Sequence, residues 1–312
     1  MINVMSKPVT LGQVSDFDIR LLRIFKTVVE CGSFSAAESV LGISRSAISL
    51  HMGDLEKRLG VCLCRRGRAG FALTDEGREV LRAANILLSA IEDFRDEVNQ
   101  LHRQLRGDLN IGIINNLVTQ SHMHVTKALK ALSARGPGVC INIAMMVPSD
   151  IEQGVLDGTL HVGVIPEIHP LPGLAYLRLY EEQSSLYCSS EHPFFLSPVP
   201  DNTAIRQAHA IFPNYRITDE AHRWLGQLHC TAKASDREGI AFLILSGHYI
   251  GFLPDHYAAT WVARGQMRAI RPDEYRYSTP LSVVVRKGRR SNMVLDSFLG
   301  ELGAPDTGRE GS

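Results

Sequence analysis

Apolar residues recur at three- and four-residue steps through the first sixty positions of the chain. A helix is expected over residues 17–31, where Leu21, Leu22, Phe25, Val28 and Val29 form one face. A second helix is expected to begin at Ser35, which forms a capping box with Glu38, and to end at Gly42. A third should run from a Ser44 cap to Gly60, with Ala47, Ile48, Met52, Leu55 and Leu59 as its buried stripe. These signals predict a small three-helix core.

A longer helical pattern follows over residues 74–105, and no proline interrupts it. Its apolar positions are Leu81, Ala84, Leu88, Ile91, Phe94, Val98, Leu101 and Leu105. So narrow a stripe on so long a helix is typical of a helix that pairs with a second copy. We therefore expect Leu81, Leu88, Ile91 and Val98 to form a dimer seam. The alternative is a helix that lies on its own domain.

Beyond residue 106 short apolar strands alternate with helical stretches. Strands are expected at 109–114, 139–147 and 161–165, with helical periodicity up to Leu132 and again from Ile151. From about Leu179 the alternation resumes, with strands at 184–188, 208–212, 228–233, 249–253 and 281–286 and helices at 219–226, 236–245, 254–264 and 292–302. This order predicts an α/β fold with a parallel, doubly wound sheet, whose ligands bind beyond the carboxyl ends of the strands.

The polar face of the helix after Ser44 carries groups that can reach base edges and phosphates. These candidates for DNA contact are Ser35, Ser44, Arg45, Ser46, Ser49 and His51, and the wing-like segment behind them adds Arg65, Arg66 and Arg68. Formal net charge is zero over the chain, but residues 1–73 hold ten Lys or Arg against six Asp or Glu, a balance of +4. The basic surplus therefore lies where DNA binding needs it. The alternative is a helical core with no partner.

Residues 17–81 resemble the winged helix-turn-helix of the LysR-type transcriptional regulators. The matching motifs are Ala36-Ala37, Leu41-Gly-Ile-Ser44, Ala47-Ile48-Ser49, Leu55-Glu56, Leu59-Gly60, Arg66 and Leu73-Thr74-Asp-Glu-Gly77. The chain departs from the family pattern at Arg45, where Gln is frequent, at Leu50, where Arg is frequent, and at Cys64, where Phe is usual. The first two departures concern the operator sequence rather than the fold.

The resemblance implies a domain plan and a function. A leader (1–16) would precede a winged helix-turn-helix (17–73), a dimerisation helix (74–106) and an effector-binding domain (107–303), with a disordered tail (304–312). The effector domain would have two α/β lobes like a periplasmic binding protein, one formed by 107–178 and 281–303 and the other by 179–280. Such a regulator binds a pseudo-palindromic promoter site on double-stranded DNA as a homodimer or homotetramer, takes a small effector such as a carboxylate, and could contact RNA polymerase.

Polar residues behind the predicted strands are candidates for effector contact. Asn115 and Asn116 follow the first strand, and Ser149 follows the second at a helix start, where free amides attract an anion. Phe212 and Pro213 follow a strand of the second lobe and could form the facing wall. The alternative role for Ser149 is helix capping alone, because Ser149 and Glu152 have the spacing of a capping box.

Other chemistry finds little support in the sequence. The twelve histidines and six cysteines show no metal-ligand spacing, so we expect neither a metal nor a cofactor. Cys188 and Cys230 leave a redox-responsive regulator as an alternative, and Cys64 is expected to be packed in the core. No Walker loop, dinucleotide fingerprint or nucleophile elbow favours the other alternative, a small-molecule-binding enzyme. No long apolar segment or signal peptide appears, so a cytoplasmic location without membrane contact is expected.

Overall fold

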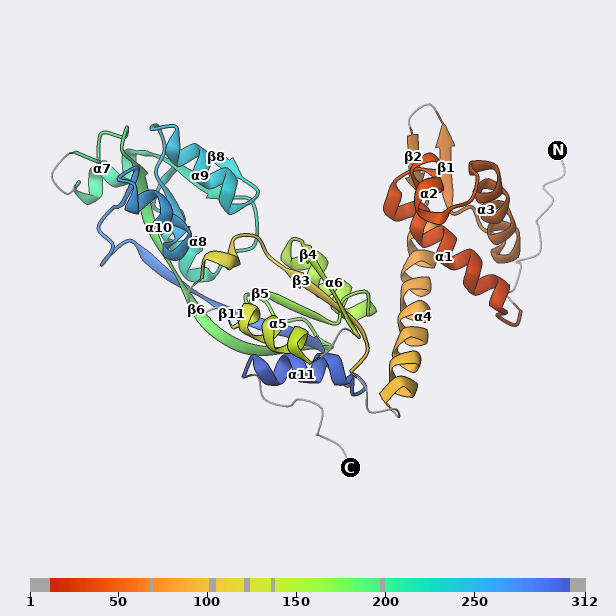
Figure 1. Cartoon of the computed structure of the whole chain (residues 1–312). Coiled ribbons are helices and arrows are strands. Elements are labelled where there is room, and N and C mark those ends of the chain that lie inside the picture. The colour runs from red at the N-terminus through yellow and green to blue at the C-terminus, as the bar shows by residue number, and fades with distance from the viewer. Residues whose placement is uncertain are drawn as a thin grey trace. The chain divides into compact units, whose positions relative to one another are not determined.

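The structure is a computed structural model that describes residues 12–67, 70–100, 105–120, 124–135, 138–196 and 200–303. Its contacts divide the chain into two compact units (Figure 1). The first holds the elements up to Arg95, and the second holds those from residue 107 onward. Residues 1–11 of the expected leader (1–16) and the expected tail (304–312) lie outside the described residues, and α1 begins at Asp16.

Four helices and a two-stranded wing make up the first unit. They are α1 (Asp16–Cys31), α2 (Phe34–Leu41), α3 (Arg45–Leu59), β1 (Cys64–Gly67), β2 (Gly70–Leu73) and α4 (Asp75–Gln100). The apolar stripes of α1, α2 and α3 meet in one core, which includes Leu21, Phe25, Ile48, Met52 and Leu55. Cys64 is buried in the same core, as the sequence predicts.

In the first unit, most of the predicted caps are confirmed, but one is wrong. Ser44 accepts a hydrogen bond from the amide of Ala47, and Gly42 and Gly60 end α2 and α3 with φ of 64° and 68°. The second helix, however, is capped by Ser33, whose hydroxyl accepts from the Ala36 amide at 3.0 Å. Gly32 ends α1 in the left-handed conformation, so its neighbour already has the extended backbone that an N-cap requires. Ser35 is left exposed in the first turn.

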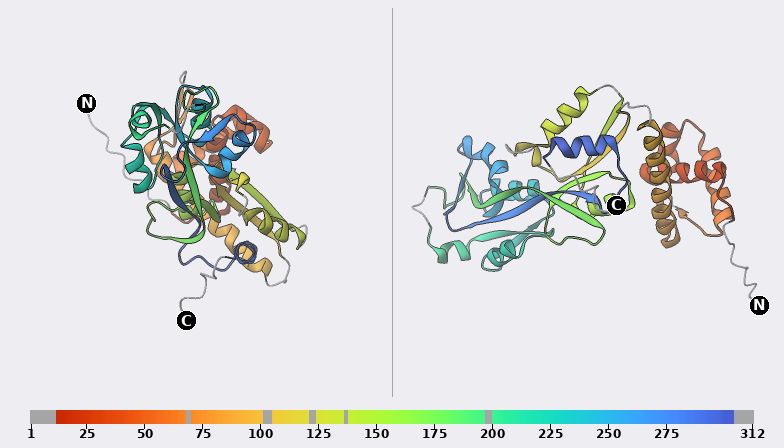
Figure 2. Two further views of the ribbon diagram at one scale, coloured as in Figure 1. Left: turned by 90° about the vertical axis from the view of Figure 1, so that its left-hand side faces the viewer. Right: turned by 90° about the horizontal axis from the view of Figure 1, so that it is seen from below.

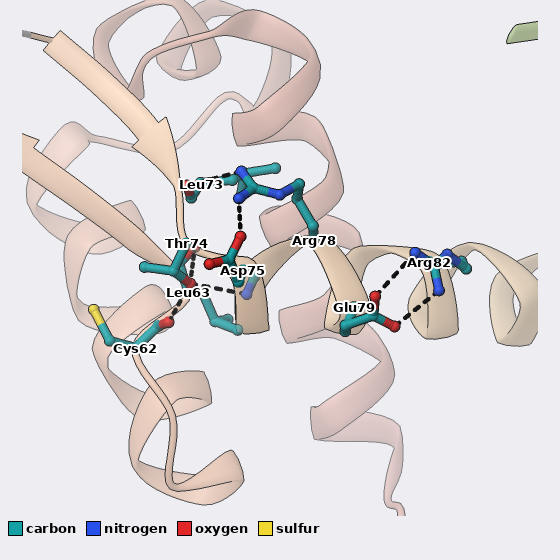
Figure 3. A network of polar contacts seen from close by, with 9 residues as sticks. Cys62, Leu63, Leu73, Thr74, Asp75, Arg78, Glu79 and Arg82 are labelled. Atoms are coloured by element: carbon teal, nitrogen blue, oxygen red, sulfur yellow. Dashed lines mark hydrogen bonds and ion pairs between the residues drawn. The ribbon is translucent and has the colours of Figure 1, made fainter.

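The junction of wing and α4 is fixed by the Thr74 hydroxyl (Figure 3). This hydroxyl donates to the Cys62 carbonyl at 2.6 Å and accepts from the Gly77 amide at 2.8 Å, so it caps α4. A Cβ at position 77 would lie 2.0 Å from the Leu63 carbonyl oxygen. The close approach of α4 to the first wing strand therefore requires glycine there, which explains the Leu-Thr-x-x-Gly pattern.

Helix α4 presents its apolar residues in two directions. Leu81 packs against the core of the first unit, and Ala84 and Leu88 are buried within the single chain. Ile91 is half-buried, whereas Ile86, Phe94 and Val98 are 45%, 63% and 40% exposed. Of the four predicted seam residues, only Val98 is exposed. The helix is expected to reach Leu105, but that residue is not helical, and residues 101–104 lie outside the described part of the chain.

The second unit is built on a seven-stranded sheet. Its strands are β3 (Gly107–Ile113), β4 (Val139–Met145), β5 (Val162–Pro166), β6 (Leu174–Ser189), β9 (Gly251–Pro254), β10 (Met267–Ala269) and β11 (Arg276–Arg286). The order is β10-β6-β11-β5-β3-β4, and β9 also pairs with β6. A separate parallel pair is formed by β7 (His209–Pro213) and β8 (His229–Ala234). The helices are η1 (Leu117–Thr119), α5 (Val125–Ala134), α6 (Pro148–Asp157), α7 (Asn202–Gln207), α8 (Asp219–Leu225), α9 (Arg237–Leu245), α10 (Asp255–Ala263) and α11 (Met293–Glu301).

Two long antiparallel strands, β6 and β11, connect two lobes, each with its own core (Figures 1 and 2). The first core includes Leu109, Val164 and Phe298, so the end of the chain returns to the first lobe. The expectation of an all-parallel sheet is wrong. Strands β3, β4 and β5 are parallel, but β11 runs antiparallel to β5 and to β6. The mixed sheet arises because β6 and β11 cross between lobes in opposite directions.

Candidate nucleic-acid interface and effector cavity

Helix α3 presents the predicted DNA contacts unequally. Arg45 and Ser46 are exposed at its start, whereas Ser49 and His51 are half-buried on its flanks. The Ser44 hydroxyl is occupied by the cap of α3 and by the Ser46 hydroxyl at 2.9 Å. The backbone amide of Arg45 donates to the Glu38 carboxylate, which ties the start of α3 to α2. The capping partner predicted for Ser35 thus fixes the turn between the two helices instead.

The wing is held against α3 by Glu56. Its Oε1 atom accepts hydrogen bonds from the amides of Leu63 at 2.8 Å and Cys64 at 3.4 Å. Arg65 is exposed on β1. Arg66 belongs to β1, but its side chain and all of Arg68 lie outside the described residues. Glu56 therefore determines where the wing stands relative to α3.

An ion pair with Asp18 fixes the far end of α3. The Asp18 carboxylate is only 6% exposed and accepts from Nε and Nη2 of Arg58, in a two-pronged arrangement. It also accepts from the amide and hydroxyl of Ser15. The Arg58 hydrogen bonds, followed by those from Ser15, lower the pKa of Asp18 to about 2. The pair links α1 to α3 and so orients the helix.

A cavity lies between the two lobes of the second unit. It encloses about 790 Å³, counting the part that is open to solvent. Apolar walls come from both lobes, among them Ile114, Met146, Ile168 and Phe252. Three helices begin at its rim, because Pro148, Thr218 and Asp236 stand at the starts of α6, α8 and α9. Helix starts carry partial positive charge, which favours an anion.

A buried carboxylate from the middle of β6 forms the polar part of the cavity wall. Glu182 is 1% exposed and pairs with Nη2 of Arg237, at the start of α9. Its other oxygen accepts from Nε2 of His256 at 2.8 Å, when that atom carries the proton. The Nδ1 atom of His256 lies 2.7 Å from the Thr119 hydroxyl of the first lobe. The chain Thr119–His256–Glu182–Arg237 thus joins both lobes to a crossing strand.

The Arg237 guanidinium has spare hydrogen-bonding capacity. Its Nη1 atom is buried and has no hydrogen-bond partner among the described residues. Two tyrosines, Tyr215 and Tyr277, line the cavity beside it. Burial raises the pKa of both phenols, although the Arg237 charge opposes the effect, so both remain neutral donors at ordinary pH. One charged and two neutral donors therefore surround the same space.

A second acid–base cluster stands at the rim. Glu152 of α6 accepts from the Tyr176 hydroxyl at 2.7 Å and lies 3.5 Å from Nη1 of Arg216, which lines the cavity. Burial, followed by a hydrogen bond to Glu152, raises the pKa of Tyr176 to about 12. Glu152 is buried and does not reach back to Ser149, so the predicted capping box is wrong. Helix α6 already begins at Pro148, which places Ser149 inside its first turn.

Of the predicted effector residues, only Asn115 lines this cavity. Asn116 adopts a left-handed backbone with φ of 70°, and its Nδ2 atom is buried without a hydrogen-bond partner in the described structure. The Ser149 hydroxyl contacts Asp150 at 3.3 Å and does not line the cavity. Phe212 and Pro213 end β7, and the wall is instead formed by the next loop, at Tyr215, Arg216 and Ile217.

Sequence reasoning missed Glu182, Arg237 and His256. The only local signal was the pair of adjacent carboxylates, Glu181-Glu182. The partners of Glu182 lie 55 and 74 residues further along the chain. Nothing in the spacing of those residues predicts that they meet.

The cysteines offer little support for a redox switch. Cys188 is buried and Cys230 is half-buried, and burial raises the pKa of both thiols. A raised pKa disfavours the thiolate, which is the form that reacts with oxidants. Within the described ranges, no group of three or more His, Cys, Asp or Glu side chains could hold a metal ion. No helix in those ranges is long and apolar enough to cross a membrane.

Comparison with known families accounts for both units. The family of bacterial regulatory helix-turn-helix proteins of the lysR type matches residues 19–78, and the LysR substrate binding domain matches residues 102–304. The chain belongs to the LysR family of transcriptional regulators. The first unit is thus a LysR DNA-binding domain, and the second is a LysR substrate-binding domain with its cavity between the lobes.

Named relatives agree with this assignment. The chain is 62% identical to the HTH-type transcriptional activator BauR of Pseudomonas aeruginosa, over 94% of this chain and 97% of that protein. Among solved structures, a full-length OxyR variant from Pseudomonas aeruginosa has a TM-score of 0.65 at 17% identity, covering 93% of this chain and 95% of that one. Full-length CbnR complexed with its target DNA has a TM-score of 0.63 at 22% identity, covering 91% and 98%. These two structures support the fold.

Proposed function

We propose that this LysR regulator is a transcriptional activator that responds to a small carboxylate held in the cavity between its lobes. The observation that carries the effector class is the buried Nη1 atom of Arg237, which has no partner in the described structure and lines the cavity. Carboxylate oxygens are the natural acceptors for a guanidinium, and a charge-assisted hydrogen bond contributes about 1.5–3 kcal/mol.

The surroundings of Arg237 favour an anion with an apolar body. Glu182 neutralises much of the guanidinium charge, and the Asp236 carboxylate caps the start of α9, so the remaining attraction comes from the starts of α6 at Pro148 and α8 at Thr218. The neutral phenols of Tyr215 and Tyr277 can donate to a second carboxylate oxygen. Ile114, Ile168 and Phe252 suit a short hydrocarbon or aromatic group. A ligand bound here would contact both lobes and so bias their arrangement.

The DNA-binding part of the proposal rests on α3 and the wing. Exposed Arg45, Ser46 and Arg65 lie where phosphates and base edges would be reached, and Ser35, Ser44, Ser49, His51, Arg66 and Arg68 complete the proposed surface. Two copies paired through α4 would place two recognition helices on a pseudo-palindromic site. The activator role follows the printed name of the 62% identical relative. A protein with this role acts on the chromosome, which places it in the cytoplasm, and it needs no catalytic activity.

The experiment compares acids with their amides on the purified full-length protein. Propionate, butyrate and benzoate should raise the thermal unfolding midpoint of the chain and change its affinity for the DNA upstream of its own gene. Propionamide, butyramide and benzamide have the same shape without the charge and should do neither. Arg237→Met should abolish the difference between the effects of acids and amides. Ser149→Ala should preserve that difference, because Ser149 does not line the cavity. Equal effects of acids and amides, or none from either, would contradict a carboxylate site.

A further inference from the structure

The outward face of α3 differs from the face expected to read DNA. Successive residues of a helix are turned by about 100°, so the line opposite the buried Ile48, Met52 and Leu55 passes through positions 46, 50, 53 and 57. These are Ser46, Leu50, Gly53 and Lys57. Ser46, Leu50 and Lys57 are exposed, whereas Gly53 is half-buried, as are Ser49 and His51 on the flanks. A helix that lies in a DNA groove presents this outermost line of residues to the base pairs.

Gly53 has no explanation within the fold. It stands in the interior of α3, where glycine is less favourable than every residue except proline. A Cβ built at this position meets no atom within 4 Å, and the backbone there is not left-handed. Gly77 shows the contrast, because a Cβ there would lie 2.0 Å from a carbonyl oxygen. Nothing in the described structure explains glycine at position 53, whereas the close approach of a partner to the α3 backbone would explain it.

Leu50 stands one turn before Gly53 and is 63% exposed. It has a large apolar side chain between the polar Ser46 and Lys57, on the surface that would face DNA. The major-groove edge of the base pairs offers one apolar group, the C5-methyl of thymine, and apolar side chains recognise it by contact. An exposed leucine at the centre of this line is therefore suited to a thymine.

We propose that α3 approaches DNA along the line Ser46–Leu50–Gly53. Gly53 lets the helix backbone come close to the groove, and Leu50 packs on the C5-methyl of a thymine in each half-site. The proposal rests on DNA binding through α3, as put forward above. It adds two residues that determine specificity and one base that the operator must contain.

The first test separates helix stability from DNA affinity. Gly53→Ala should raise the unfolding midpoint, because alanine is the better helix former, yet weaken operator binding at least tenfold. Gly300→Ala is the matched control, since Gly300 lies within α11 of the other unit and a Cβ there also meets nothing within 4 Å. The Gly300→Ala variant should raise the unfolding midpoint without changing DNA affinity. Unchanged operator binding by a stabilised Gly53→Ala protein would overturn the role of Gly53.

The second test removes one methyl group from the DNA. The DNA upstream of the gene is first footprinted with the protein to locate the operator. Uracil then replaces thymine at one position of the operator at a time, and the affinity of the protein for each DNA is measured by fluorescence anisotropy. At one thymine per half-site the wild type should lose about three- to tenfold in affinity. Leu50→Ala should lose the same amount of affinity for the natural DNA, and uracil at that position should not change its affinity further. Because Leu50 is exposed, the variant should keep its wild-type unfolding midpoint.

Two outcomes distinguish this inference from the function it rests on. If the wild type binds the fragment but no uracil affects it, or if Leu50→Ala and the wild type are equally sensitive, the thymine contact is refuted and DNA binding stands. If neither the wild type nor any variant binds the fragment or other DNA recovered by selection with the protein, the proposed DNA-binding surface itself fails.

Discussion

Replacing Arg237 by Gln should both destabilise the effector domain and remove its response to acids. The Glu182 side chain is 1% exposed and that of Arg237 is 12% exposed, so solvent screens this pair little. Removing one partner of a buried ion pair leaves an uncompensated charge and costs about 3–5 kcal/mol. His256 still donates to Glu182, and the glutamine amide can donate once, so we expect the lower end, about 3 kcal/mol.

The double variant Glu182→Gln/Arg237→Gln provides the matched control. It leaves no unpaired charge and should unfold within about 1 kcal/mol of the wild type, because neutral replacement of a buried pair is often harmless. The two substitutions should therefore be strongly coupled in a double-mutant cycle. Both variants should lose the response to acids, whereas Glu182→Gln alone should bind acids more tightly, because the Arg237 charge is then no longer offset.

Tryptophan fluorescence makes the measurement specific to the effector domain. The chain has two tryptophans, and Trp224 and Trp261 both stand in the second unit, on α8 and α10. Urea unfolding followed by their emission reports that unit alone. Operator affinity of the unliganded protein serves as a second readout and should be unchanged, since α3 belongs to the other unit. A single variant that costs under about 1 kcal/mol, or a double variant as unstable as the sum of the singles, would refute the coupled pair.

Three further predictions concern the first unit and α4. Phe94→Asp should dissociate the oligomer in light scattering without unfolding the chain, because Phe94 is 63% exposed. Leu88→Asp should instead lower the unfolding midpoint, because Leu88 is buried. A Phe94→Asp protein of wild-type size would place the dimer seam elsewhere. Arg45→Ala should weaken specific DNA binding by about 1–3 kcal/mol while the fold survives, and an unchanged footprint would exclude Arg45 from the interface. The pKa of Asp18 is lowered to about 2, so its ion pair with Arg58 stabilises the fold above about pH 4, and this stabilisation is lost as pH falls toward 2. In circular dichroism of the full chain, Asp18→Asn should lose less stability than the wild type over this pH range. Identical acid unfolding profiles of the two proteins would refute the stabilising role of the pair.

The helix-turn-helix could be predicted closely from the sequence because its signals are local. Ser44, Gly42 and Gly60 each act within one turn of the residue that they cap or end, and the apolar stripe of α3 needs no distant partner. The error at Ser35 has the same origin. Two serines, two positions apart, are both plausible caps, and only the left-handed backbone at Gly32 shows that Ser33 takes the role. A capping rule applied to the sequence cannot choose between Ser33 and Ser35, because the choice depends on where the preceding helix α1 ends.

The effector cavity could be located in the sequence but not described in detail. The rule that ligands lie beyond strand ends led to Asn115, after β3, and this residue lines the cavity. It failed for Phe212 and Pro213, because β7 continues through Pro213 and the wall begins two residues later. It also gave no hint of Glu182, which lies in the middle of a strand rather than at its end. That strand spans both lobes, so its middle is where the lobes meet.

The two candidate sites therefore differ in how the sequence encodes them. The DNA-facing line of α3 lies within a single helix, and its unusual members, an exposed leucine and an interior glycine, break helix rules that can be checked from the sequence alone. The proposed effector site rests on a hydrogen-bonded chain of Glu182 from β6, Arg237 from α9, His256 from α10 and Thr119 from η1, which meet only when both lobes have formed. It follows that transplanting α3 residues into a related LysR protein should transfer operator preference, because the frame around the helix is common to the family. Transplanting Arg237 alone should not transfer an effector, because its orientation depends on a carboxylate 55 residues earlier in the chain.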